Sequence, residues 1–140
     1  MTQGTQGDWT SSNTLMAAIV LSAIAAGVHM LASPQHFEEW WGYGLFFIVA
    51  AAAQALYAIV LVLRPLTRRL FMVGLVGNVG IVILWLITRT VGIPIFGPEA
   101  GVVEEISTVD TVSKVVELAL IVCLWRLLGT LPRAETTAGG

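Results

Sequence analysis

The stretch 43–63 reads YGLFFIVAAAAQALYAIVLVL and contains no charged side chain. A helix needs about 20 mostly apolar residues to cross the hydrocarbon core of a bilayer. The stretch is too long for a strand, and it lacks strict alternation of apolar and polar residues. Inside hydrocarbon every backbone N–H and C=O group must bond within the protein, which an isolated segment achieves only as a helix. The stretch therefore predicts a membrane-spanning helix.

Three other segments approach the same length and apolar character, at about 14–32, 70–88 and 111–128. The last is the weakest because it contains Lys114, Glu117 and Arg126. Proline and glycine punctuate helical patterns, and they mark the breaks between these segments, at Pro34, at Pro65 and from Gly92 to Gly101. We therefore expect an all-α integral membrane protein, a four-transmembrane-helix bundle of up-down topology. It forms a single domain, 1–140, in which 1–13 and 132–140 are flexible.

The composition agrees with a membrane protein. Hydrophobic residues make up 56% of the chain and charged residues 11%, whereas soluble domains carry about 25% charged residues. The net charge of −2 and the lack of a basic run give no reason to expect a nucleic-acid partner. The single cysteine, Cys123, excludes an intrachain disulfide and a Cys-x-x-Cys redox pair. The first fourteen residues lack Lys and Arg, so we interpret 14–32 as a retained helix and not as a secretory signal.

The distribution of basic residues predicts the orientation. Five of them flank one side of the expected bundle, namely Arg64, Arg68, Arg69, Arg126 and Arg133. The other side has two, Arg89 and Lys114. Because positive residues stay in the cytoplasm, we expect a multi-pass protein of the cell membrane with both termini cytoplasmic. The short loop 33–42 and the long loop 89–110 then face outward.

Each expected helix carries one polar residue away from its ends: His29, Gln54, Asn78 and Glu117. Ionisable residues at membrane depth are costly and usually face the bundle interior or a cavity. Small residues share their helix faces, which favours close helix contacts. We therefore expect the four side chains to converge on one bundle axis.

Helical spacing places Trp85 and Arg89 on the stripe of Asn78, which completes a set of candidate ligand-binding residues: His29, Gln54, Asn78, Trp85, Arg89 and Glu117. Structural roles remain open for the same residues. Gln54 and Asn78 can simply hold helices together. Glu117 can pair with Lys114 one turn earlier or with Arg89 across the bundle. His29 can be a neutral imidazole bonded to a neighbouring helix.

A metal site is a further hypothesis for the outward end. Its candidate ligands are His29, His36, Glu39 and Glu117, and His with carboxylates suits zinc, copper, iron or manganese. Their spacing is not diagnostic of any metal. Haem held by two histidines is disfavoured because both histidines lie at the same end of one helix. The long loop, with its prolines and apolar residues, is expected to fold back as a lid or to dock on a partner.

Three functions remain compatible with these patterns. The first is a non-enzymatic accessory or scaffold subunit of a membrane assembly, or a homo-oligomer, because the motif Gly74-x-x-Gly77-x-x-Gly80 offers a flat helix face. The alternative is an outward-facing module that binds or transports a small ligand or ion through His29, Arg89 and Glu117. A second alternative is a metal-dependent membrane enzyme. The expected partners are the lipid bilayer and either another protein or a second copy of the chain.

Overall fold

The computed structural model of the chain describes residues 4–93 and 96–131. Within these residues it has four α-helices and no strand: α1 (Gly4–Glu39), α2 (Trp41–Leu63), α3 (Arg68–Thr90) and α4 (Thr108–Thr130). Three of them, α1 to α3, are long and apolar enough to cross a membrane. The fourth, α4, has the length of a crossing helix but is less clearly apolar.

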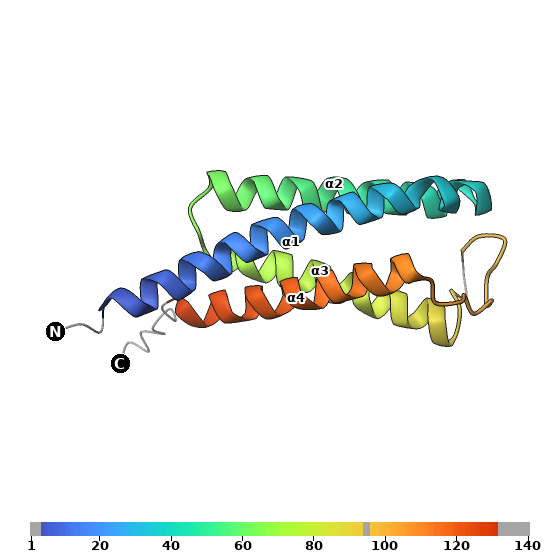
Figure 1. Cartoon of the computed structure of the whole chain (residues 1–140). Coiled ribbons are helices and arrows are strands. Elements are labelled where there is room, and N and C mark those ends of the chain that lie inside the picture. The colour runs from blue at the N-terminus through green and yellow to red at the C-terminus, as the bar shows by residue number, and fades with distance from the viewer. Residues whose placement is uncertain (1–3, 94–95, 132–140) are drawn as a thin grey trace, which may run out of the picture.

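Consecutive helices run in opposite directions (Figure 1). The start of α1, the α2–α3 connection and the end of α4 therefore lie together, at what we call the arginine end after Arg64, Arg68 and Arg69. The α1–α2 turn and the connection 91–107 lie at the opposite end, called the loop end. Helix α1 packs along α2 and α4, and α3 packs along α4, whereas the backbones of α2 and α3 scarcely approach each other.

Helix α1 is longer than the predicted 14–32. It contains 36 residues, which corresponds to about 54 Å at 1.5 Å per residue against roughly 30 Å of hydrocarbon. Residues 4–13, expected to be flexible, are helical, while 1–3 and 132–140 lie outside the described residues. The predicted break at Pro34 and the loop 33–42 are also wrong, since only Trp40 separates α1 from α2.

The helix continues through Pro34 because Ser33 supplies the missing hydrogen bond. Proline has no N–H, so the carbonyl oxygen of Met30 loses its usual partner four residues later. The hydroxyl of Ser33 donates to that oxygen at 2.8 Å. Such a bond satisfies a backbone group that hydrocarbon cannot satisfy, and α1 therefore extends to His36 and Glu39 at the loop end.

Capping residues set the ends of the other helices. The Thr67 hydroxyl accepts a hydrogen bond from the N–H of Leu70 at the start of α3. Ser107 and Asp110 form a reciprocal capping box at the start of α4. After α3, Gly92 adopts a φ of 76°, a backbone conformation that favours glycine, and the chain turns into the long connection.

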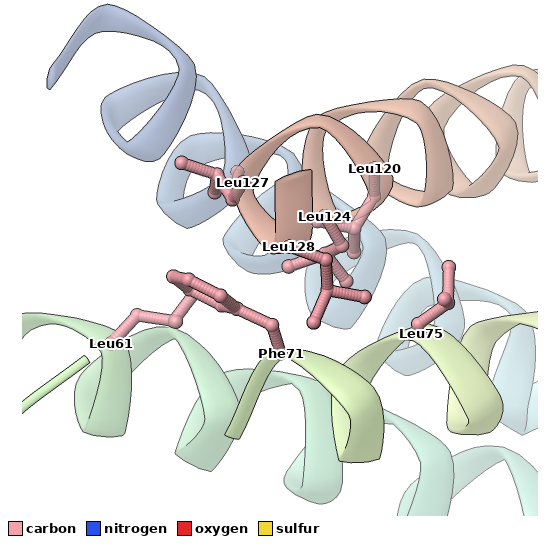
Figure 2. Close-up of a cluster of buried hydrophobic side chains, with 8 residues drawn as sticks. Leu61, Phe71, Leu75, Leu120, Leu124, Leu127 and Leu128 are labelled. Carbon is pink, nitrogen blue, oxygen red and sulfur yellow. The ribbon is translucent and has the colours of Figure 1, made fainter. Parts of the chain in front are cut away.

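A cluster of apolar side chains fills the arginine half of the bundle (Figure 2). It draws on all four helices and comprises Ala18, Leu61, Phe71, Leu75, Leu120, Leu124, Leu127 and Leu128. Among lipid chains, close packing rather than escape from water is what holds helices together. The arginine half is thus closed by packing, and the structure leaves its open space in the loop half.

Candidate functional site

Gln54 and Asn78 form a buried layer in the middle of the bundle. The side-chain amide of Gln54 on α2 donates to the Asn78 side-chain oxygen on α3 at 3.2 Å. Asn78 in turn donates to the carbonyl oxygen of Gly74 at 2.8 Å. The hydroxyl of Ser22 on α1 donates to the carbonyl oxygen of Gln54 at 2.8 Å. This layer links three helices, in the way expected for amides that hold helices together.

Nearer the loop end, His29, Lys114 and Glu117 form a buried ionic group. His29 Nε2 lies 2.8 Å from Glu117 Oε1, and the Lys114 ammonium bonds to the other carboxylate oxygen. Glu117 has no exposed surface, and His29 is 3% exposed. Because a carboxylate can only accept, Nε2 carries the hydrogen.

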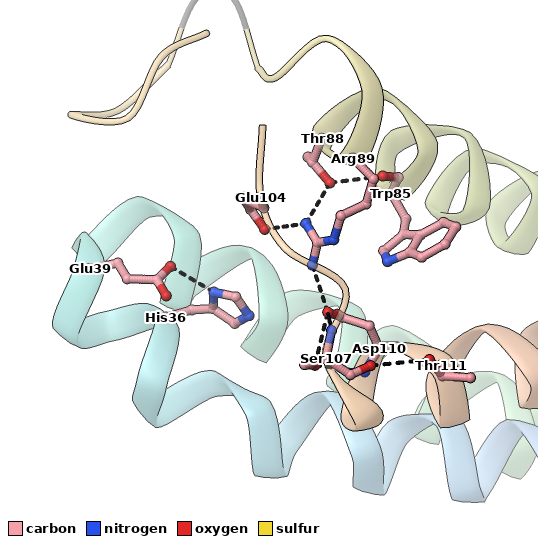
Figure 3. Close-up of polar contacts among 9 residues, drawn as sticks. All are labelled: His36, Glu39, Trp85, Thr88, Arg89, Glu104, Ser107, Asp110 and Thr111. Atoms are coloured by element: carbon pink, nitrogen blue, oxygen red, sulfur yellow. Dashed lines mark hydrogen bonds and ion pairs between the residues drawn. The ribbon is translucent and has the colours of Figure 1, made fainter. Parts of the chain in front are cut away.

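Arg89 does not join this ionic group. It bonds to residues at the end of α3, in the connection and at the start of α4 (Figure 3). Its guanidinium donates to Asp110 Oδ2 at 2.7 Å, to Glu104 and to the Thr88 hydroxyl at 2.9 Å. These bonds tie the connection and α4 to the end of α3. Burial pushes the pKa of the Asp110 carboxyl upward, but hydrogen bonds from Arg89 and Ser107 outweigh that effect and lower the pKa below its ordinary value.

The four central polar residues are all buried inside the bundle, but they do not form one group. They form two separate pairs at different heights, Gln54 with Asn78 and His29 with Glu117. Of the two ion-pair partners considered for Glu117, the structure contains Lys114 and not Arg89. Asn78 and Arg89 share one helical stripe, but Asn78 bonds to Gln54 in the middle layer and Arg89 bonds to residues at the loop end.

The candidate metal ligands are likewise divided. His36 Nδ1 pairs with Glu39 at 2.9 Å, apart from the His29–Glu117 pair. The Phe47 ring contacts both imidazoles, stacking on His36 at 3.9 Å between centroids and meeting His29 edge-on at 5.5 Å. Across residues 4–93 and 96–131 no three His, Cys, Asp or Glu residues are grouped so that they could hold a metal ion.

A cavity of about 420 Å³ occupies the loop half of the bundle. All four helices and the connection contribute to its wall. Much of the wall is aromatic, with rings from Trp40, Tyr43, Phe46, Phe47, Trp85 and Phe96. Three of the predicted binding residues, His29, Trp85 and Arg89, line this cavity. Glu117 lies behind His29, while Gln54 and Asn78 belong to the layer below.

Four residues of the cavity wall carry a buried polar atom with no hydrogen-bond partner among the described residues. These atoms are His29 Nδ1, Trp85 Nε1, Arg89 Nε and Ser113 Oγ. An unpaired buried donor or acceptor costs about 1–3 kcal/mol, and native proteins contain few of them. Four of the five such atoms in the described residues therefore belong to residues that line this one cavity.

The described parts of the connection, 91–93 and 96–107, cover this end of the bundle, as the lid hypothesis expected. The Tyr43 hydroxyl donates to the carbonyl oxygen of Phe96 at 2.9 Å, and the Glu104 N–H donates to the Thr88 carbonyl at 3.1 Å. Gly97 has a φ of 87°, and a Cβ there would lie 2.3 Å from the Tyr43 hydroxyl oxygen. Glycine is therefore required where the connection crosses Tyr43.

Sequence reasoning missed most of the aromatic wall and the role of Ser113. The signal for the wall was present in the stretch 36–47, HFEEWWGYGLFF, which concentrates rings at a helix junction. Ser113 shares a helix face with Glu117, one turn away, but a serine at a helix start carries no distinct signal by itself.

No protein-family model, curated protein or solved structure gives a significant match to this chain. The geometry of the cavity and of the groups around it is therefore the basis for assigning a function.

The buried ionic group gives a first prediction. Replacing Glu117→Ala leaves the Lys114 ammonium buried without its carboxylate, which should lower the free energy of unfolding by about 3–5 kcal/mol. The double variant Glu117→Leu with Lys114→Met removes both charges and should recover most of that loss. Thermal unfolding in mild detergent measures both. Glu105→Ala, at an exposed position, is the control and should change stability by less than about 0.5 kcal/mol.

If the double variant is no more stable than Glu117→Ala, burial of an unpaired Lys114 is not the cause of the loss, and the ionic group has been described wrongly.

Proposed function

We propose that this chain is an integral membrane protein that crosses the bilayer four times and binds a small molecule in the cavity at the loop end. The observation that carries the proposal is the set of four unpaired buried polar atoms in the wall of an aromatic cavity. Only one other buried side-chain atom of the described residues is unpaired, Gln54 Oε1 in the layer below, so these atoms are concentrated at the cavity.

The proposal that α4 also crosses the bilayer rests on the positions of its charged residues. Lys114 and Glu117 are buried and bonded to each other, so neither charge faces lipid. The remaining cation, Arg126, lies one turn from the end of the helix, where its long side chain can reach the headgroups. With the basic residues concentrated at the arginine end, the positive-inside rule places that end in the cytoplasm and the loop end outside.

Single-cysteine labelling tests this orientation. In a Cys123→Ser background, Glu99→Cys on the connection should react with a membrane-impermeant maleimide added to intact cells. Arg64→Cys at the arginine end should react only after the membrane is permeabilised. The reverse pattern would invert the orientation, and labelling of both positions in intact cells would contradict the crossing itself.

The dimensions of the cavity fit ligand binding. Small-molecule sites have volumes of about 300–1,000 Å³, apolar and aromatic walls, and a few convergent polar groups. The cavity of about 420 Å³ has each of these properties. The connection covers it, and Arg89 fastens the connection through Glu104 and the start of α4 through Asp110.

Binding is favoured over transport because packed side chains of the described residues lie between the cavity and the arginine end. Below the cavity lies the Gln54–Asn78 layer, and below that layer the leucine-rich cluster fills the arginine half. A transport path would need to open both. A binding role requires neither change.

A matched pair of substitutions tests whether the cavity holds a molecule. Ala32→Phe adds a ring at a cavity-lining position of α1, whereas Ala53→Phe adds the same ring at an exposed position of α2. Small molecules that copurify with the protein are extracted and quantified by mass spectrometry. The wild type and Ala53→Phe should retain the same compound, and Ala32→Phe should lose at least nine-tenths of it.

If all three proteins retain the same compounds in the same amounts, or none retains any, the binding function is refuted. Thermal unfolding of Ala32→Phe is measured in parallel, so that loss of the compound is not confused with loss of the fold.

A second candidate function, assembly with another copy of the chain, is supported by the outer face of α3. Gly77 and Gly80 are exposed, and a Cβ added at either would meet nothing within 4 Å. Gly74 is different, since its missing side chain makes room for Tyr57 within the bundle. Exposed small residues let a second helix approach closely in a bilayer.

This candidate predicts an oligomer in mild detergent. The double substitution Gly77→Leu with Gly80→Leu should convert it to a monomer, as measured by mass in light scattering after size exclusion. Gly27→Leu on α1, also at an exposed glycine with open space around it, should leave the mass unchanged. A monomeric wild type would refute the assembly role and would leave the cavity proposal untouched.

A further inference from the structure

The charges around the cavity are already paired. Arg89 bonds to Glu104 and Asp110, and Lys114 bonds to Glu117. In the described part of the wall, both cations already bond to carboxylates, and the two wall carboxylates, Glu104 and Asp110, both accept from Arg89. An ionic ligand of either sign would have to displace one of these pairs or be buried without a partner, and both are costly. The wall therefore favours an uncharged ligand.

The unpaired polar atoms specify what such a ligand must carry. Trp85 Nε1–H and Arg89 Nε–H can only donate, so both need an acceptor. Ser113 Oγ can donate as well as accept, and the role of His29 Nδ1 depends on the tautomer of the ring. Trp85 and Arg89 are one helical turn apart on α3, with the guanidinium carbon 6.0 Å from the indole centroid. Figure 3 shows the two side chains next to each other at the end of α3.

The aromatic side chains of the wall favour a ligand that contains a flat ring. Phe47 already packs its ring on two imidazoles, and Trp40 lies edge-on to Tyr43 at 5.1 Å between centroids. Aromatic pairs at 4.5–7 Å are stabilised beyond the area they bury. A flat ligand can insert among such side chains with similar contacts.

The position of the cavity favours entry from the bilayer. Its wall includes Leu45 and Phe46 of α2 and Leu84 of α3, and the first two also have much of their surface exposed on the outside of the bundle. The backbones of α2 and α3 scarcely approach each other, so side chains alone close this part of the wall. In a bilayer those side chains face lipid, and a molecule that passes between them must itself be soluble in lipid.

We infer that the cavity binds an uncharged, lipid-soluble aromatic compound whose oxygen atoms accept hydrogen bonds from Trp85 and Arg89. This inference rests on the proposed binding function and adds the chemical class of the ligand. It names Trp85 as a residue that determines specificity, since its indole N–H is one of the two obligatory donors.

Three probes of similar size separate the possible ligand classes. The first, 2,3-dimethyl-1,4-naphthoquinone, is flat, uncharged and has two carbonyl acceptors. The second, 2,3-dimethylnaphthalene, has the same ring without acceptors, and the third, 1-methylquinolinium, is a flat cation. Apparent Kd values are obtained from the thermal stabilisation of the full chain in nanodiscs, with concentrations corrected for partition into empty nanodiscs. The quinone should bind at least tenfold more tightly than either of the other two.

A matched pair of tryptophan variants tests the role of the indole donor. Trp85→Phe keeps an aromatic ring but removes the N–H, and it should weaken quinone binding about fivefold, the equivalent of one hydrogen bond of roughly 1 kcal/mol. It should leave the affinity for 2,3-dimethylnaphthalene unchanged, which a general loss of structure would not do. Trp125→Phe, at an exposed position near the other end of α4, should change neither affinity.

Equal binding of the quinone and the hydrocarbon would overturn the requirement for acceptors, and tighter binding of the cation would overturn the requirement for an uncharged ligand. If Ala32→Phe removes a copurifying compound but the quinone does not bind, the ligand class is wrong while the binding function stands. If Ala32→Phe removes nothing and no probe binds, both are wrong.

Discussion

The whole arrangement depends on one constraint of the bilayer, namely that a polar group inside it must find its partner within the protein. Each long helix carries at least one such group, and the partner is on another helix in every central case: Gln54 with Asn78, and His29 with Glu117. These bonds determine which faces of the helices meet and at what height. The apolar residues then fill the space that the polar contacts leave.

The constraint also divides the bundle into two unlike halves. In the arginine half, polar groups are few and leucine side chains from α4 interlock with Phe71 and Leu75 of α3. In the loop half, charged and aromatic residues are bulky and are held by specific partners, such as Arg89 between Glu104 and Asp110. Groups fixed in this way cannot collapse into the remaining space, and a cavity persists among them.

Hydropathy was sufficient to predict helices α2, α3 and α4 to within three residues at each end, because apolar length is a property of the segment alone. It was not sufficient for α1, since the bond from Ser33 that carries the helix past Pro34 depends on a side-chain conformation. The positions of His29 and Glu117 within their helices correctly predicted that both face the bundle interior. The same reasoning could not show that His36 turns toward Glu39 and Phe47, because rotation about the helix axis is settled only by packing.

The proline in α1 also determines how the molecule can move. The helix lacks one main-chain hydrogen bond at Pro34, and the replacement from Ser33 runs within the same turn. Such a point is a hinge, about which the last turns of the helix bend more easily than the rest. His36 lies beyond it and His29 before it, so bending tilts one imidazole while the other stays fixed to Glu117. The cavity wall thus has one histidine on each side of the point where α1 lacks a main-chain hydrogen bond.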